Sequence, residues 1–454
     1  MATKQNNFAE GKMSINILKI ALPMTLAQLI NLLYNIVDRI YIGQIPGTAT
    51  LALTGVGLTF PIITMISAFA NFFGMGGAPL TSIERGSGNL KRAEKIMGNS
   101  FWLCLVFSIT LFLFFFLTKT PLLYAFGASS ETIGYANDYI TIYLIGTFFV
   151  MVGTGMNNFI NAQGFASIGM LSVLLGAVSN IILDPILIFG LGMGVKGAAI
   201  ATVISQGLSA LWILQFLTSR KAILKLRLEH LKPDWKIIRS IIALGTTGFV
   251  MGVTNSVVQI FANSTLATFG GDLYVGVMTV LNSIREIVQM PANGITSGAQ
   301  PVLGYNYGAK RPDRVKQGIR FLTLIGILYT LVAWGILYFF PHFFISIFNN
   351  DDALRQAAEP ALKIYFFGFF MMSLQFVAQS VFVALGQAKQ AVFFSIFRKI
   401  IIVVPLTLIL PHCFGLGVNG VFLAEPISNF LGGLASFGTM YWTIYRQIDK
   451  EDQQ

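Results

Sequence analysis

Twelve long apolar segments constrain this chain more than any other feature of its sequence. A helix that crosses a membrane needs about 20 mostly apolar residues. Charged residues make up 11% of the 454 residues here, against about 25% in soluble domains. Polar breaks divide the chain into runs near 15–42, 52–82, 97–118, 136–162, 167–189, 195–219, 237–264, 272–304, 318–345, 356–385, 391–411 and 417–445. We therefore predict an all-α integral membrane protein with twelve transmembrane helices.

The lysines and arginines between these runs predict the orientation of the chain. They gather in alternate connecting segments, whereas the segments of the opposite side hold only Lys119, Lys196, Arg355 and Lys363. Basic loops stay in the cytoplasm, so both termini are expected there, in a multi-pass protein of the cell membrane. The net charge of +11 comes from these loops, and nucleic acid is not expected as a partner.

The two halves of the sequence repeat each other. Gly194-Val-Lys-Gly197 opens the sixth run and Gly417-Val-Asn-Gly420 opens the twelfth, an offset of 223 residues from Gly194 to Gly417. Such repeats occur in transporters built from two parallel halves. We expect two six-helix lobes, at 1–218 and 237–454, related by a pseudo-two-fold axis along the membrane normal. A basic cytoplasmic linker at 219–236 would join them.

Two carboxylates lie within apolar runs of the first half. Asp38 is in the first run and Asp184 in the fifth, where Asn180 precedes it by one helical turn and Pro185 follows it. A charged side chain at membrane depth costs several kcal/mol, and two nearby carboxylates repel until a proton or cation lies between them. The pattern predicts a Na⁺ or proton site with oxygen ligands. Thr202 is a weaker candidate, because threonines commonly bond to their own helix.

Further polar residues within the apolar runs are candidates for a substrate cavity. In the first run Gln28, Asn31, Asn35 and Asp38 share one helix face, although bonding between helices explains Gln28 and Asn31 equally well. As a group, the candidate cavity residues are Gln28, Asn31, Tyr34, Asn35, Tyr139, Asn157, Asn158, Asn161 and Met290. Each of them alone is more typical of packing.

Nothing in the sequence indicates an enzyme or a bound cofactor. The two cysteines and three histidines have no metal-ligand spacing, and the loops are too short for a catalytic domain. The chain is expected to work as a monomer in the lipid bilayer.

The sequence resembles the multidrug and toxic compound extrusion (MATE) family, and within it the bacterial MepA-like branch. The resemblance rests on Asn180-Ile-Ile-Leu-Asp184-Pro, Gly194-Val-Lys-Gly197-Ala-Ala, Asp38-Arg-Ile-Tyr-Ile-Gly43 and the eighth-run residues from Arg285 to Asn306. It implies export of amphipathic, mostly cationic drugs in exchange for Na⁺ or H⁺ by alternating access. It also implies an ion site built from Asp38, Asn180, Asp184, Thr202 and, by position, Ala198.

The second half departs from the branches of that family that carry acids in the seventh and tenth spans. Here those runs offer amides: Asn255, Gln259, Gln375 and Gln379. Glu286 is interpreted as a local ion pair with Arg285, and Glu425 as structural. The alternative function is a lipid-linked oligosaccharide flippase of the same superfamily. It would need a strongly cationic cavity, for which only Arg39, Arg285, Arg398 and Lys399 are candidates.

Overall fold

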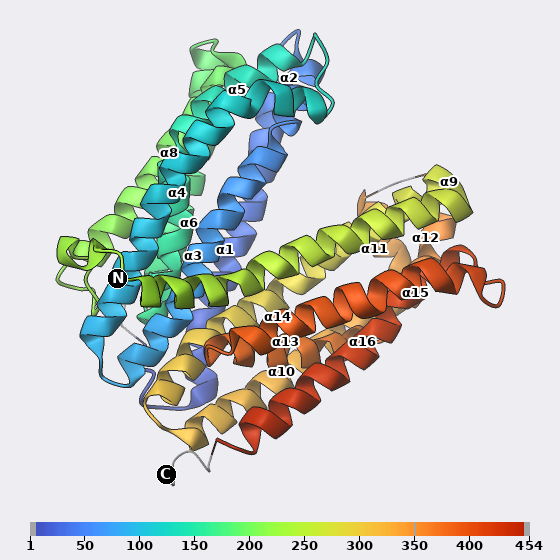
Figure 1. Cartoon of the computed structure of the whole chain (residues 1–454). Helices are drawn as coiled ribbons and strands as arrows, with labels where there is room; N and C mark the ends of the chain where they lie inside the picture. Colours follow the sequence, from blue (N-terminus) through green and yellow to red (C-terminus); the bar gives the residue numbers. More distant parts are fainter. Residues whose placement is uncertain (1–5, 349–350, 449–454) are drawn as a thin grey trace. The chain divides into compact units, whose positions relative to one another are not determined.

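Helices account for all the regular structure in the described part of the chain. A computed structural model describes residues 6–348 and 351–448 (Figure 1), and it contains no strand within them. Apolar runs favour this outcome, because a backbone surrounded by lipid must satisfy its own hydrogen bonds. The contacts between residues divide the chain into two compact units: unit 1 is Met1–Asn7 with Leu22–Gly245, and unit 2 is Phe8–Ala21 with Thr246–Gln454.

The helices match the twelve expected runs. Among the described residues, eight helices are long and apolar enough to cross a membrane, and two bent helix pairs pass the same test together. One of the eight, α9 (Trp235–Gly308), contains two arms that meet at Gly271, whose φ of 67° lies outside the helical range. Counting both arms and adding α16 (Val418–Met440) gives twelve segments, as the sequence predicts.

Unit 1 is a bundle around an apolar core. Helix α3 packs against α4 and α6, and α8 packs against α5, α6 and α7. The bend between α5 and α6 is 57°. The elements of unit 1 are most of α1 (Met13–Ile42), α2 (Ala49–Gly57), α3 (Phe60–Gly86), α4 (Leu90–Ala125), α5 (Ile133–Ile145), α6 (Thr147–Ala162), α7 (Ala166–Pro185), η1 (Ile186–Gly190), α8 (Gly194–Thr218), η2 (Leu228–Leu231) and the start of α9.

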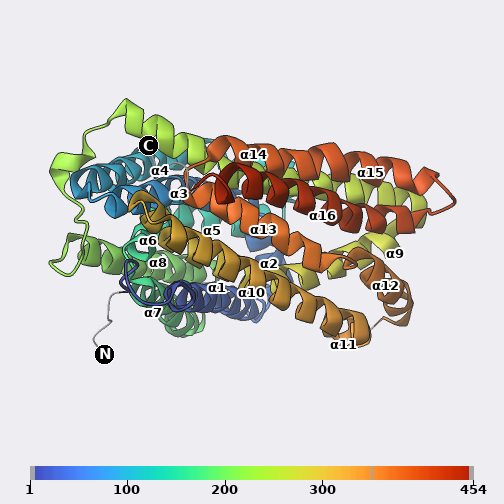
Figure 2. The same ribbon diagram turned by 90° about the horizontal axis from the view of Figure 1, so that it is seen from below.

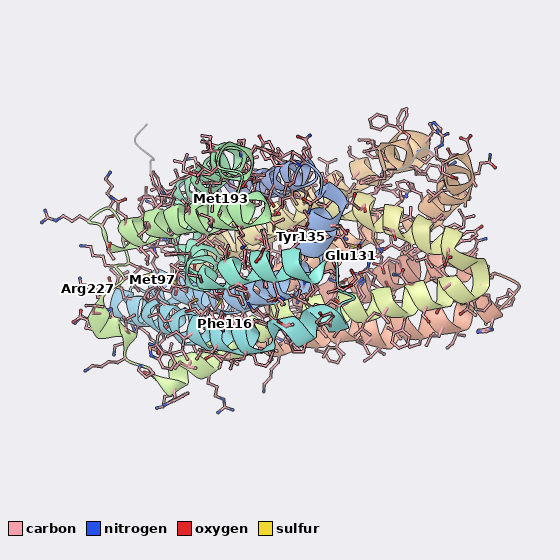
Figure 3. The ribbon with its side chains drawn as sticks, turned by 90° about the horizontal axis from the view of Figure 1, so that it is seen from above. Met97, Phe116, Glu131, Tyr135, Met193 and Arg227 are labelled. Carbon is pink, nitrogen blue, oxygen red and sulfur yellow. The ribbon has the colours of Figure 1, made fainter. Side chains whose placement is uncertain are left out.

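The basic segment 219–236 docks on one end of unit 1. The backbone N–H of Lys225 donates to Oε1 of Glu94 over 2.9 Å, and that of Asp234 donates to Oδ1 of Asn99 over 2.8 Å. Figure 3 shows Arg227 at the end of α4 that carries Met97, whereas Glu131 lies at the opposite end. The α4 helix thus holds this basic segment at one end of the unit.

Unit 2 is a second helical bundle, centred on α13 and α16, which pack side by side (Figure 2). Helices α12 and α13 bend by 52° around Gly368, and α10 packs against α13. Its other elements are α10 (Pro312–Phe339), α11 (Pro341–Phe348), α12 (Asp352–Tyr365), α13 (Phe369–Ala384), α14 (Ala388–Ile396), η3 (Phe397–Val403), α15 (Val404–Ile409), η4 (Leu410–His412) and η5 (Tyr441–Tyr445).

The N-terminal segment of the chain is part of unit 2. Nδ2 of Asn306 donates to the carbonyl oxygen of Phe8 over 3.1 Å, and Nη1 of Arg314 donates to that of Gly11 over 3.0 Å. A Cβ atom on Gly298 would lie 2.6 Å from Cα of Ala21, so α9 and the start of α1 are in close backbone contact. Residues 8–21 are therefore held by both hydrogen bonds and packing.

The repeated glycine motif forms the same local structure in each unit. Gly194 is the first residue of α8 and Gly417 directly precedes α16, and their φ angles are positive, 55° and 52°. Three residues later, a Cβ atom on Gly197 would lie 2.7 Å from the backbone of Leu187, and one on Gly420 would lie 2.6 Å from that of Leu410. Only glycine allows this close approach of helix start to preceding backbone, which explains why the motif occurs twice.

Candidate ion site

Unit 1 brings together the two carboxylates that the sequence singles out. Asp38 on α1 and Asp184 on α7 are buried, with exposed fractions of 8% and 0%. Their carboxyl groups lie within hydrogen-bonding range of each other. Two bare carboxylates at that separation repel, so this contact requires a proton or a cation between them.

Asn180 completes a group of oxygen atoms at this place. One turn before Asp184 on α7, its Nδ2 donates to Oδ1 of Asp184 over 3.3 Å. That bond leaves three buried oxygens without a protein donor among the described residues: Oδ1 of Asp38, Oδ1 of Asn180 and Oδ2 of Asp184. Buried polar atoms are nearly always hydrogen-bonded. Three orphaned acceptors side by side are suitable ligands for a hard cation.

Helix α8 forms another wall of the group. Oγ1 of Thr202 donates to the carbonyl oxygen of Ala198 over 3.0 Å, and both residues are buried. Thr202 is also a hydrogen-bonding partner of Tyr139 on α5. The family resemblance implies that Thr202 and Ala198 belong to the site, and the structure shows Thr202 bonding to its own helix, the ordinary role of a helical threonine. Its hydroxyl oxygen still has lone-pair capacity for a further partner.

Two tyrosines among the candidate cavity residues lie beside the carboxylates. Tyr34 lies near both Asp38 and Asp184, and Tyr139 lies near Asp38. Tyr139 stacks on Tyr143, with ring centroids 6.2 Å apart, and both belong to the apolar core of unit 1. The aromatic rings exclude water, which strengthens every charge interaction inside.

The end of α7 has an irregular backbone beside the site. Pro185 has no N–H to donate, and the helix continues from Ile186 to Gly190 as a π-helical turn. Such turns are rare and frequently occur at functional sites. The glycine start of α8 packs directly on this turn, which fixes α7 and α8 relative to each other around Asp184.

The remaining candidate cavity residues make mostly local contacts. On α1, Nδ2 of Asn35 donates to the carbonyl of Asn31 over 2.6 Å, and both are exposed, whereas Gln28 is half-buried. On α6, Nδ2 of Asn158 donates to the carbonyl of Thr154. Asn157 and Asn161 direct their side-chain oxygens at Gly169 on α7, and Met290 belongs to unit 2. Nδ2 of Asn157 donates to the carbonyl oxygen of Gly169 over 3.3 Å, so the hydrogen bonds shown for the α6 asparagines go to backbone carbonyls.

Two neighbours of the carboxylates escaped the sequence analysis. Gln206 bonds to Tyr34, and Tyr143 stacks on Tyr139. Both follow a candidate residue by one helical turn, since Gln206 comes four residues after Thr202 and Tyr143 four after Tyr139. That spacing on one helix face was the signal that would have found them.

In unit 2 the charged residues pair differently from the expectation. Arg285 forms an ion pair with Glu425, its Nη1 lying 3.4 Å from Oε1, rather than with its neighbour Glu286. Adjacent residues on a helix do not face each other. Arg398 and Lys399 contact the same carboxylate, so three of the four cations considered for a flippase lie together.

Comparisons with known proteins agree with this architecture. A family model described as MatE matches residues 23–186 and 249–409. The multidrug export protein MepA of Staphylococcus haemolyticus is 26% identical over 428 residues, 93% of each chain. MepA of Staphylococcus aureus strain NCTC 8325 is 24% identical over 93% of this chain and 92% of its own.

Solved structures share the fold at low sequence identity. A MATE in a bent conformation superposes with a TM-score of 0.93 at 24% identity and covers 100% of both chains. An outward-facing multidrug resistance MATE transporter of the MOP superfamily gives a TM-score of 0.89 at 24% identity, covering 99% of this chain and 100% of its own.

Proposed function

Since this chain belongs to the MatE family of multidrug transporters, we propose that it exports amphipathic, mostly cationic organic compounds in exchange for Na⁺ or H⁺. The observation that carries the proposal is the group of orphaned oxygens on Asp38, Asn180 and Asp184. The curated relatives at 24–26% identity are multidrug export proteins, which supports drugs as the transported compounds. The protein works in the cell membrane, as a monomer with both termini in the cytoplasm.

The coupling ion acts by relieving repulsion between the two carboxylates. With the site open to the outside, Na⁺ or a proton binds between Asp38 and Asp184, and Asn180 supplies a neutral oxygen. Ion binding favours the state that releases drug outside, and ion release to the cytoplasm resets the transporter. Such coupling requires that ion and drug prefer different states. Two six-helix lobes, 1–218 and 237–454, would rock about a pseudo-two-fold axis around the cavity, with 219–236 as their cytoplasmic linker.

Several residues near the carboxylates have proposed supporting roles. Thr202 and the carbonyl of Ala198 would supply further oxygen ligands, and Tyr34 and Tyr139 lie beside the carboxylates. The residues proposed to contact the drug are Gln28, Asn31, Tyr34, Asn35, Tyr139, Asn157, Asn158, Asn161 and Met290. An apolar cavity with a few polar groups suits varied ligands.

The flippase alternative has weaker support. Arg285, Arg398 and Lys399 do cluster, but Glu425 pairs with all three, and Glu286 lines the same cavity. The remaining excess is one positive charge, too little for a pyrophosphate headgroup. Drug export is therefore the function that we propose.

The test is efflux of a fluorescent cationic dye from proteoliposomes with sodium and pH gradients imposed separately. One gradient should drive efflux by the wild type and neither should drive it in Asp38→Asn or Asp184→Asn. Glu131→Gln, which removes an exposed carboxylate of the same unit, should behave as the wild type. Undiminished gradient-driven efflux by Asp184→Asn would discard the site.

A further inference from the structure

A second group of buried ionisable residues lies in unit 2, and the proposed exchange cycle does not use it. Among the described residues of unit 2, Glu425 on α16 is the only buried carboxylate. Nη2 of Arg398 donates to Oε1 of Glu425, and Nζ of Lys399 lies 3.3 Å from Oε1 and 3.5 Å from Oε2. Arg398, Lys399 and Glu425 have exposed fractions of only 3%, 6% and 5%.

Neutral groups hold the two arginines in place. Arg398 donates to Oε1 of Gln375 and to Oδ1 of Asn429, each over 2.7 Å. Arg285 donates to the hydroxyl of Tyr365 over 2.7 Å. For Lys399, by contrast, the hydrogen bonds shown in the described part of the chain all go to Glu425, at long distances. Its ammonium group, with three donors, is the least satisfied of the three cations.

The charges of this group do not cancel. Three cations (Arg285, Arg398 and Lys399) face the carboxylate of Glu425, and Glu286 is a second carboxylate on the same cavity, with an exposed side chain. One positive charge is in excess when all five are ionised. An uncompensated charge at membrane depth is unfavourable, and a single monovalent anion would neutralise it.

A cavity of about 160 Å³ gives such an anion a place to bind. Its charged lining consists of Arg285, Glu286, Lys399 and Glu425, and two further lining residues, Asn255 and Gln259, are exposed. The rest of its lining includes apolar side chains: Val258, Ala262, Met278, Val403 and Val421. An engineered cavity of about 150 Å³ in another protein holds benzene, so a ligand with a compact apolar body fits here.

The internal repeat relates this cavity to the ion site of unit 1. At the offset of 223 residues that separates Gly194 from Gly417, four residues of the ion site correspond to four residues lining the cavity. Asn180 corresponds to Val403, Asp184 to Thr407, Ala198 to Val421 and Thr202 to Glu425. Unit 2 thus lacks the amide of Asn180 and the carboxylate of Asp184 at the equivalent positions, and its cavity is lined instead by the cations Arg285 and Lys399 beside Glu425.

We propose that unit 2 binds a small organic anion, a monocarboxylate with a compact apolar body, at Lys399 and Arg285. The carboxylate accepts hydrogen bonds from the Lys399 ammonium and the Arg285 guanidinium. The apolar side chains of α9, η3 and α16 contact the body of the ligand. This site binds its ligand independently of the coupling ion in unit 1.

The test is thermal unfolding of the purified full-length protein in nanodiscs, titrated with sodium benzoate, acetate, chloride or gluconate. Sodium concentration and ionic strength stay constant, so that the cation site contributes equally throughout. A ligand of the folded state raises the midpoint as its concentration increases. Benzoate should act at roughly tenfold lower concentration than acetate, because it buries a ring on the apolar wall, and gluconate should have no effect.

Matched variants separate the site from general salt effects. Lys399→Gln removes one cation. Gln259→Glu adds one carboxylate and leaves every cation in place. Both variants should abolish the shift of the unfolding midpoint by benzoate. Lys399→Arg should keep it, and so should Lys389→Gln, which removes an exposed lysine. Bound chloride broadens the chloride NMR signal, and displacement of that chloride by benzoate should sharpen the signal again. This measurement gives a second readout for any variant that unfolds early. No benzoate shift in the wild type, an equal response to chloride, or a full shift in Gln259→Glu would overturn the proposal.

Discussion

The side-chain amide nitrogen of Asn180 donates to Oδ1 of Asp184 over 3.3 Å, and Oδ1 of Asn180 and Oδ2 of Asp184 remain without a donor. Asn180 therefore both orients Asp184 and offers its own oxygen to a bound ion. Replacing Asn180 with an apolar residue of similar size removes both polar roles but keeps the space filled.

We expect Asn180→Leu to raise the coupling-ion concentration for half-maximal efflux by about tenfold, since a lost ion ligand is worth ~1.4 kcal/mol or more. The measurement is dye efflux at a series of ion concentrations. Gln215→Leu, an amide replacement at an exposed position of α8, is the control and should not change the half-maximal value. An unchanged value in Asn180→Leu would remove Asn180 from the site.

Thr202 is expected to contribute less than the carboxylates. Thr202→Val leaves the carbonyl of Ala198 without its 3.0 Å bond, which should lower the free energy of unfolding by ~1–3 kcal/mol. Efflux driven by the ion gradient should fall only partly. Thr202→Ser keeps the hydroxyl and should retain both properties. Complete loss of efflux in a folded Thr202→Val protein would show that the hydroxyl is an essential ligand.

The glycines of the repeat should be intolerant of a side chain. Gly197→Ala and Gly420→Ala place Cβ within 2.7 Å and 2.6 Å of backbone atoms, and such overpacking typically costs ~1–3 kcal/mol. Both should lower the unfolding midpoint. Gly207→Ala on α8, whose Cβ would meet the ring of Phe149 at 3.7 Å, should be neutral or stabilising, because alanine favours helix. Equal midpoints for all three would contradict the packing account.

Glu425 should matter for stability even though it lies outside the ion site. Glu425→Gln leaves three cations facing a neutral group, and breaking a buried ion pair in this way costs ~3–5 kcal/mol. Glu359→Gln, near the exposed His342, is the control with little expected change. The double variant Glu425→Gln/Lys399→Gln should recover part of the loss, since it removes one unpaired cation. A double variant no more stable than the single one would argue against the charge balance.

The sequence was sufficient for the helices because apolar length alone determines which segments can span a membrane. It also singled out Asp38, Asn180 and Asp184, which the structure brings together, since polar groups are conspicuous among apolar neighbours. It could not identify the partner of Arg285, because the choice between Glu286 and Glu425 depends on how α9 and α16 pack. Nor could it predict that Tyr34 and Tyr139 lie beside the carboxylates, because the surroundings of a tyrosine depend on how the neighbouring helices pack.

The bends within spans were equally hidden. The run 136–162 contains two helices that meet at 57°, and the run 356–385 contains two that meet at 52°. An apolar run does not reveal where its helix changes direction. The bend at Gly368, with a φ of 76°, depends on a conformation that glycine adopts readily. The many glycines in apolar runs made this one hard to distinguish.

The most direct test of the central claim compares two assays on one variant, Asp184→Asn. Exchange of labelled drug for unlabelled drug across the membrane requires drug binding and alternating access but no ion gradient. Net uphill efflux requires the ion gradient as well. If Asp184 holds the coupling ion, the variant retains exchange and loses gradient-driven efflux. Gradient-driven efflux at the wild-type rate would contradict the account.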